Sequence, residues 1–299
     1  MAILLTGKTG QLGTQLRRLL ACSDQVIAVG RDELDLSDSQ RLAQNLRNLP
    51  GIDLIVNTAA CTAVDHAETD SDTAFAVNAT APAILAEEAK RRDIPIIHFS
   101  TDYVFDGNKN NPYTETDFPC PLSVYGQSKL EGEQRIKEIW HKHLIIRCSG
   151  MYGIGYAGFL TTMLNFARSD TAPRVVRDQI VSPNYSPCVA GAVNHIIHKV
   201  ITRQKIEWGT YHLSGTGETS WYEFARCIFE NVSNLWNVEL PDPIPVDSLE
   251  FGAKAKRPAY SVLDSTKFER LFQFTMPSWD EQFRLCMEDM IAQTNDENR

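Results

Sequence analysis

The sequence predicts an α/β fold of the Rossmann type: a doubly wound parallel sheet, with a smaller C-terminal α/β substrate lobe interleaved with it. Short apolar runs alternate with helix-like stretches through the first half of the 299-residue chain, which is the rhythm of the crossover units that build a parallel sheet. Two of the runs, around Ile55-Val56 and Ile96-Ile97, are continuously apolar rather than alternating. Strands that are buried on both faces show this pattern.

The expected elements of the first half alternate strictly. The strands are Ala2–Thr6, Gln25–Val29, Leu54–Thr58, Ile94–Ser100 and His143–Arg147, and helices begin near Gln11, Ser39, Asp72 and Val124. Ligands of open α/β sheets bind at the carboxyl ends of such strands. We therefore expect the functional site among the residues that follow each strand.

The pattern loosens after residue 150. The expected elements there are a helix near Leu160–Ala167, short strands around Arg174–Val176 and Tyr211–Leu213, and helices from Ser220 and Ser278. We expect residues 1–148 and 174–218 to form a dinucleotide-binding domain, and residues 149–173 and 219–299 to form a substrate-binding lobe.

Net charge and the absence of certain segments exclude several classes of protein. A net charge of −9 and an isoelectric point near 5.3 argue against attraction to nucleic acid or to an anionic membrane surface. The sequence shows no basic leader with an apolar run behind it, and no apolar run of about eighteen uncharged residues. We expect neither a signal peptide nor a membrane span.

Cysteines and histidines point to a reduced, metal-free protein. Seven cysteines without a CxxC pair fit free thiols in a reducing compartment, and hence the cytoplasm. They are Cys22, Cys61, Cys120, Cys148, Cys188, Cys227 and Cys286. The pairs His141/His143 and His195/His198 have no cysteine or carboxylate partners at ligand spacing, so we expect no metal site.

A glycine-rich turn follows the first expected strand. Its glycines, Gly7, Gly10 and Gly13, have GxxGxxG spacing and open a helix. Gly7 permits the tight turn, Gly10 lets backbone N–H groups approach a pyrophosphate, and Gly13 allows close packing of the helix on the sheet. An ordinary strand-to-helix turn has the same spacing, but the position after the first strand favours a dinucleotide site that includes Thr9.

The end of the second expected strand bears on which dinucleotide binds. An NAD-binding protein commonly has an acidic residue there, which accepts hydrogen bonds from the adenine ribose. This chain has Gly30-Arg31-Asp32. The guanidinium of Arg31 suits a 2′-phosphate, which favours NADPH. NADH stays possible, because Asp32 fits the acidic role and Arg31 also fits a solvated surface charge.

Tyr125 and Lys129 form the candidate catalytic pair. They stand at i and i+4, and so share one face of an expected helix. A phenol has an ordinary pKa near 10, so it needs an adjacent ammonium to transfer its proton near neutral pH. The hydroxyl of Thr101, at the end of the preceding strand, can polarise a substrate carbonyl. A surface YxxxK pair and a capping threonine are the plain alternatives.

These motifs lie within longer segments that resemble the dTDP-4-dehydrorhamnose reductases, of the extended short-chain dehydrogenase type, over nearly the whole chain. The segments are Leu4–Gly13, Val56–Glu68 (VNTAACTAVDHAE), Asn78, His98–Phe105 (HFSTDYVF), Pro112–Glu115, Pro121–Lys129 (PLSVYGQSK), Arg147, Asp178-Gln179, Arg257-Pro258 and Ser261–Lys267 (SVLDSTK). The resemblance implies NADPH-dependent reduction of the 4-keto group of a nucleotide-linked 6-deoxyhexose, dTDP-4-dehydro-β-L-rhamnose, in polysaccharide biosynthesis.

The resemblance also implies roles for individual residues. The expected cofactor contacts are Gly7, Thr9, Gly10, Gln11, Leu12, Gly13, Arg31, Asp35, Leu36, Ala60, Cys61, Thr62, Tyr125 and Lys129. The expected substrate contacts are Thr101, Asp102, Tyr125, Gly150 and Arg257. Arg257 lies in a basic cluster with Lys254 and Lys256 that can pair with a diphosphate.

The chain departs from the family pattern on the substrate side. Gly150 stands where these reductases usually have tryptophan, and Val181-Ser182-Pro183-Asn184 replaces a Gly-x-Pro-Thr segment. Gln15 replaces a glutamate that holds magnesium in dimeric members, so we expect a monomer or a weak homodimer. Tyr103 follows Thr101-Asp102 where nucleotide-sugar dehydratases have glutamate, which disfavours dehydration.

Two alternatives stay open. The chain fits a 4-keto reductase for a different nucleotide sugar. It also fits a non-catalytic binding homologue, such as a regulatory subunit of a methionine adenosyltransferase. Trp221, at the start of an expected helix, is a candidate wall of the nucleobase pocket, although burial in a core is the commoner fate of tryptophan.

Overall fold

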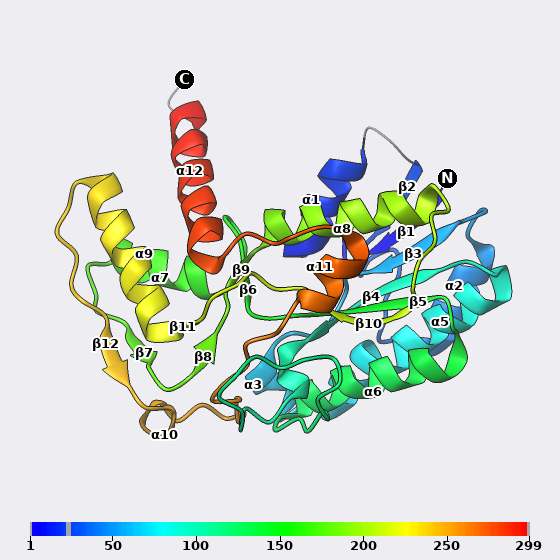
Figure 1. Cartoon of the computed structure of the whole chain (residues 1–299), viewed down its shortest axis with the longest axis horizontal. Helices are drawn as coiled ribbons and strands as arrows, with labels where there is room; N and C mark the ends of the chain where they lie inside the picture. The colour runs from blue at the N-terminus through cyan, green and yellow to red at the C-terminus, as the bar shows by residue number, and fades with distance from the viewer. Residues whose placement is uncertain (1, 22–24, 298–299) are drawn as a thin grey trace.

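The computed structural model describes residues 2–21 and 25–297 and has a parallel six-stranded sheet at its centre (Figure 1). The strand order is β2-β1-β3-β4-β5-β10. The strands are β1 (Ala2–Thr6), β2 (Gln25–Val29), β3 (Leu54–Asn57), β4 (Ile96–Thr101), β5 (His143–Cys148) and β10 (Gly209–His212). Every neighbouring pair is parallel, which confirms the predicted doubly wound fold.

Alternate residues of each strand serve opposite faces of the sheet. Val56 belongs to the core beneath α1 and α8, whereas its neighbour Ile55 belongs to the core beneath α2, α5 and α6. The continuous apolar runs of the sequence therefore supply two cores at once. The helices are α1 (Gln11–Leu20) and α8 (Ser186–Ile201) on one face, and α2 (Ser39–Asn48), α5 (Ala81–Arg92) and α6 (Val124–Ile139) on the other.

The expected helix from Asp72 is broken into three pieces. They are α4 (Ser71–Phe75), a π-helical turn η1 (Ala76–Thr80), and α5. A shorter helix, α3 (Val64–Ala67), precedes them. Single π turns often occur at functional sites, and Asn78 of η1 is fully buried against α6.

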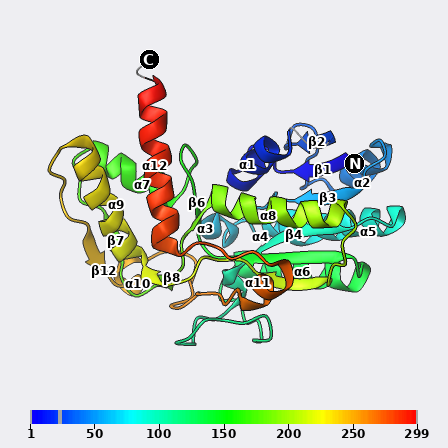
Figure 2. The same cartoon turned by 45° about the horizontal axis from the view of Figure 1, so that its top comes forward.

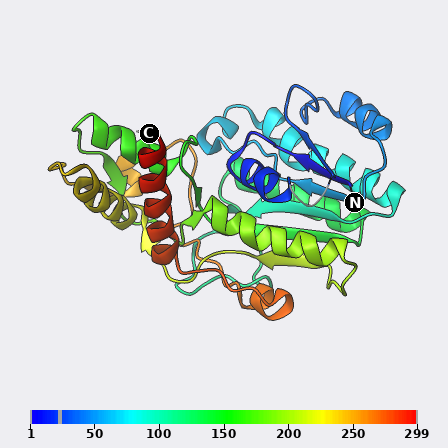
Figure 3. The same cartoon turned by 90° about the horizontal axis from the view of Figure 1, so that it is seen from above.

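The second lobe lies at the opposite end of the molecule from β2, in each of three views (Figures 1, 2 and 3). Its core is formed by α7, α9 and α12. Its elements are α7 (Phe159–Arg168), α9 (Trp221–Trp236), α10 (Ser248–Phe251), α12 (Trp279–Glu297), and the strand pairs β7 (Arg174–Val176) with β12 (Ile244–Val246) and β8 (Ile180–Val181) with β11 (Thr219–Ser220). The helices predicted near Leu160, Ser220 and Ser278 are confirmed.

Several connections join the two lobes. β6 (Met151–Tyr152) pairs with β9 (Asn184–Tyr185), and α11 (Thr266–Phe272) returns from the second lobe to pack beside β10. The predicted domain boundaries stay a prediction. We note that β7 and β8 pair with strands of the second lobe, although residues 174–181 fall in the range expected for the dinucleotide-binding domain.

No helix in the described part of the chain is long and apolar enough to cross a membrane. Of the seven cysteines, Cys22 lies outside the described residues, and the other six are free thiols.

Candidate functional site

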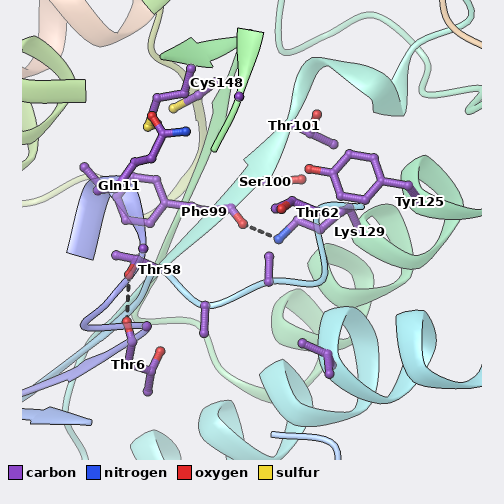
Figure 4. A pocket seen from close by; sticks show the side chains of 18 of the residues that line it. Thr6, Gln11, Thr58, Thr62, Phe99, Ser100, Thr101, Tyr125, Lys129 and Cys148 are labelled. Atoms are coloured by element: carbon purple, nitrogen blue, oxygen red, sulfur yellow. Dashed lines mark hydrogen bonds between the residues drawn. The ribbon is translucent and has the colours of Figure 1, made fainter. Parts of the chain in front are cut away.

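A cleft of about 790 Å³ lies at the carboxyl ends of the central strands β1, β3 and β4 (Figure 4). The chain leaves β1 toward β2 on one side and later returns to β3 on the other, which makes this the switch point where α/β sheets bind ligands. Most of the predicted site residues line it. They are Gly7, Thr9, Gly10, Gln11, Leu12, Arg31, Asp35, Leu36, Ala60, Thr62, Thr101, Asp102, Tyr125, Lys129 and Gly150.

Three predicted residues lie outside the cleft walls. Gly13 packs α1 against the turn, Cys61 holds its loop through its backbone, and Arg257 is engaged by Asp65. The cleft includes other residues that were not among the expected cofactor and substrate contacts. They are Thr6, Gly30, Leu34, Thr58, Ala59, Val64, Val77, Phe99, Ser100, Tyr103, Cys148, Ser149, Met151, Tyr156, Ala157 and Gly158.

The glycine turn is built as its sequence predicts. Gly7 has φ +77°, a conformation that L side chains rarely adopt. A Cβ on Gly13 would lie 2.1 Å from the carbonyl oxygen of Gly7, so only glycine allows α1 to approach this closely. No side chain caps the start of α1 and no acidic residue lies in its first turn. Its backbone N–H groups therefore remain available to an anion.

The end of β2 places Arg31, rather than Asp32, at the cleft. Both residues are exposed, but of the two only Arg31 lines the cleft. Glu33, for which the sequence predicts no role, accepts a 2.8 Å hydrogen bond from the backbone of Gly30 through its carboxylate and pairs with Lys8. This ion pair fixes the loop that carries Arg31.

Helix α6 presents the candidate catalytic pair, Tyr125 and Lys129, to the cleft. The side chain of Ser123 accepts from the backbone of Gly126 and caps the helix one residue before its start. Lys129 is 2% exposed, and its ammonium donates to the carbonyl oxygen of Phe99 at 2.5 Å. Burial lowers the pKa of Lys129 to about 8. The ammonium is therefore charged at neutral pH and loses its proton in mildly alkaline solution.

Tyr125 points its hydroxyl toward Ser100 and Thr101 in Figure 4. Burial of that hydroxyl raises the pKa of Tyr125, and a hydrogen bond with Thr101 partly opposes the shift. From the sequence we expect the ammonium of Lys129 to favour the phenolate. In the structure burial is the largest influence, so Tyr125 is held as the neutral phenol, which is the form that donates a proton.

Thr101 and Asp102 form a buried polar pair beside Tyr125. The Thr101 hydroxyl donates to Asp102 at 3.0 Å, and Ser149 donates to the same carboxyl group at 3.0 Å. Burial raises the pKa of Asp102 to about 6 even though these hydroxyl groups favour its ionised form. The pair places two polar groups where a substrate oxygen would meet Tyr125.

Asn78 connects the loop after β3 to helix α6. Its side chain donates to the carbonyl oxygen of Cys61 at 3.0 Å, accepts from the backbone of the same residue at 2.9 Å, and donates to Ser128 at 3.0 Å. In the sequence, Asn78 stood out only as one of the residues that carry the family resemblance. Nothing in its neighbourhood predicts the π turn that directs its side chain toward α6.

Comparison with known proteins agrees with this geometry. The model of the RmlD substrate binding domain family matches residues 1–292. The chain belongs to this family. It is 36% identical to a dTDP-4-dehydrorhamnose reductase of Burkholderia thailandensis over 98% of this chain and all of the relative. Its RmlD-type fold also matches two crystal structures titled dTDP-4-dehydrorhamnose reductase, each at TM-score 0.87 and 33% identity.

The first of these structures is from Clostridium acetobutylicum, and the match covers 97% of this chain and 99% of that one. The second, from Bacillus anthracis, is in complex with NADP, and the match covers 96% of this chain and 99% of that one. The resemblance inferred from the sequence is thereby confirmed. A UDP-glucose 4-epimerase of Thermotoga maritima shares the fold of this RmlD-family chain at 16% identity and TM-score 0.81, which shows the fold alone.

Proposed function

We propose that the chain is an NADPH-dependent oxidoreductase that reduces the 4-keto group of dTDP-4-dehydro-β-L-rhamnose to give dTDP-β-L-rhamnose, for polysaccharide biosynthesis. One observation carries the proposal: Tyr125, Lys129 and Thr101 meet at the wall of the cleft that begins at the glycine turn. Membership of the RmlD family supports the nucleotide-sugar substrate.

The cleft suits a dinucleotide at both ends. The uncapped start of α1 and the space over Gly10 fit a pyrophosphate, and Arg31 fits a 2′-phosphate. The buried Oε1 of Gln11 has no protein partner in the described structure, which suits a ligand in the cleft. Asp35 and Leu36 would border the adenine, and the segment from Ala60 to Thr62 would border the middle of the cofactor.

Each catalytic side chain then has one role. Bound NADPH supplies the hydride that adds to the keto carbon. Tyr125 donates its phenolic proton to the keto oxygen, so that the C=O bond becomes CH–OH. The hydroxyl of Thr101 would turn from Asp102 to donate to that oxygen and polarise it. The ammonium of Lys129 stabilises the phenolate that Tyr125 leaves behind, and solvent returns the proton.

The substrate side of the cleft carries this chain's own features. Arg257, held by Asp65 through bonds of 2.6 and 3.2 Å, would turn to the substrate diphosphate. Tyr103 occupies the place of the dehydratase glutamate, so elimination of water has no acid–base partner there. We further propose that the chain acts in the cytoplasm as a monomer or a weak homodimer.

Product analysis tests the proposal. NADPH oxidation is followed with dTDP-4-dehydrorhamnose and, in parallel, with other nucleotide 4-keto sugars. We expect turnover to be fastest with the first substrate, with dTDP-rhamnose as the product. Tight NADPH binding without turnover of any 4-keto sugar would overturn the proposal and favour a non-catalytic binding role.

A further inference from the structure

A buried row of polar side chains crosses the sheet toward the catalytic lysine. Thr6 of β1, Asn57 of β3 and His98 of β4 are direct partners in the strand register. Their exposed fractions are 1%, 0% and 0%. The Thr6 hydroxyl donates to Oδ1 of Asn57 at 2.6 Å, and the amide group of Asn57 lies 2.9 Å from Nδ1 of His98. A buried polar group is costly unless it is paired, and within this row Thr6, Asn57 and Nδ1 of His98 pair with one another.

The row fixes the tautomer of His98. Oδ1 of Asn57 also accepts from the backbone of Ala59 at 3.3 Å, so Nδ2 of Asn57 must face the imidazole and donate to its Nδ1. Burial and the charge of Lys129 hold the pKa of His98 well below its ordinary value, so the ring is neutral. A neutral ring whose Nδ1 accepts carries its proton on Nε2.

That Nε2–H group faces the catalytic ammonium. Nε2 of His98 lies 3.5 Å from Nζ of Lys129. An ammonium has three N–H donors and no acceptor, so no Lys129 hydrogen can bond in that direction. One hydrogen goes to the carbonyl oxygen of Phe99. The other two N–H groups therefore point toward the open side, which is the cleft that Lys129 lines (Figure 4).

We propose that His98 is a positioning residue for Lys129: its Nε2–H group closes the inner side of the ammonium and turns the remaining N–H groups toward cofactor and substrate. This inference rests on the proposed role of Lys129. The imidazole itself touches no reacting atom, because it lies on the sheet side of the lysine. Its effect passes through the direction and the protonation of the ammonium.

The other groups around Lys129 do not fill this place. Glu133, one turn along α6, raises the pKa of Lys129 by its charge, but its carboxylate is held by Arg147 through bonds of 2.8 and 2.7 Å and does not bond Nζ. Burial raises the pKa of Cys148 on β5 to about 12, so its thiol is neutral. Asn78, which contacts α6 from η1, carries no charge. His98 thus contacts Nζ directly, and the polar row determines which nitrogen of its ring carries the proton.

The first test needs no substitution. Nitrogen-15 NMR of the histidine rings in the full chain, recorded from pH 6 to pH 9, reports the tautomer of each ring. We expect one fully buried histidine to remain neutral with its proton on Nε2 throughout, and His98→Asn to assign it by removing its signals. A proton on Nδ1, or a charged ring at pH 6, would overturn the inference whether or not the chain reduces a sugar.

The second test compares two buried histidines. Asparagine in His98→Asn keeps an acceptor for Asn57 but removes the group that faces Lys129. His212→Asn is the matched control, because His212 is also 0% exposed and bonds a backbone carbonyl oxygen, but lies beside Arg147. Reduction needs the charged ammonium, so the rate falls as pH rises through the pKa of Lys129.

In His98→Asn the N–H dipole that faces Lys129 is removed, which favours the charged form of Lys129. We therefore expect the alkaline limb of kcat in His98→Asn to move up by about half a pH unit or more, and kcat at neutral pH to fall about tenfold through lost orientation. His212→Asn should keep the native limb. The inference would be contradicted if His98→Asn kept the native alkaline limb of kcat and lost as much Tm as His212→Asn. His98 would then have a structural role alone.

Discussion

The indole of Trp221 fills the space beside Gly150. A Cβ on Gly150 would lie 2.7 Å from Cη2 and 3.0 Å from Cζ2 of that ring. Gly150 lines the cleft just after β5, whereas Trp221 begins α9 in the second lobe and packs against Phe159 with a centroid distance of 4.6 Å. The start of α9 thus supplies an indole next to the position where the family resemblance led us to expect tryptophan.

Gly150→Ala should weaken both stability and substrate binding. The new methyl group must displace the indole, which we expect to cost about 1 to 3 kcal/mol and to raise KM for the nucleotide sugar without changing affinity for NADPH. Trp221→Leu should relieve the clash. Thermal unfolding and KM of the two single variants and the double variant check this, and strictly additive effects would refute the contact.

Arg31→Ala should lower cofactor discrimination. Loss of a guanidinium paired with a 2′-phosphate should weaken NADPH binding about 10- to 100-fold and leave NADH binding nearly unchanged. Arg41→Ala is the control, because Arg41 is an exposed arginine of α2 paired with Asp38. Fluorescence titration with both cofactors measures the ratio, and equal losses for NADPH and NADH would assign Arg31 to another task.

Asp102 should make the native state less stable as pH rises from 4 to 6. The pKa of its carboxyl group is raised to about 6 in the folded chain from an ordinary value of 3.8, so the folded state binds more protons in this window. Asp102→Asn cannot titrate. The stability of this variant relative to the native chain should therefore grow by about 1 to 3 kcal/mol between pH 4 and pH 7.

Urea unfolding at several pH values measures that difference. Above pH 7 the difference should be constant, because Asp102 is then ionised in both states. A difference that shrinks as pH rises would mean that the folded environment favours the carboxylate instead.

The sheet and the cofactor turn could be predicted because their signals are local. Apolar runs marked β3 and β4, and the spacing of Gly7, Gly10 and Gly13 required backbone geometry that the structure contains. Tyr125 and Lys129 share a helix face by simple periodicity. Each of these features depends on residues within two turns of one another.

The rest of the site depends on contacts between distant segments. Asn57 and His98 are 41 residues apart, and the sequence does not state the strand register that makes them neighbours. Trp221 reaches Gly150 only because α9 folds back to the cleft. Asn78 reaches its partners from a π turn, and the local sequence does not predict that turn. Burial decided the proton state of Tyr125, and burial follows from the whole fold.

In the proposed reaction Tyr125 gives its proton to a keto oxygen while hydride comes from NADPH. Single-turnover oxidation of bound NADPH by saturating dTDP-4-dehydrorhamnose tests it most directly, in the native chain and in Tyr125→Phe. We expect the rate to fall about 100- to 10,000-fold, with affinity for NADPH unchanged. A Tyr125→Phe variant that oxidises NADPH at the native rate would contradict the role of Tyr125 as proton donor.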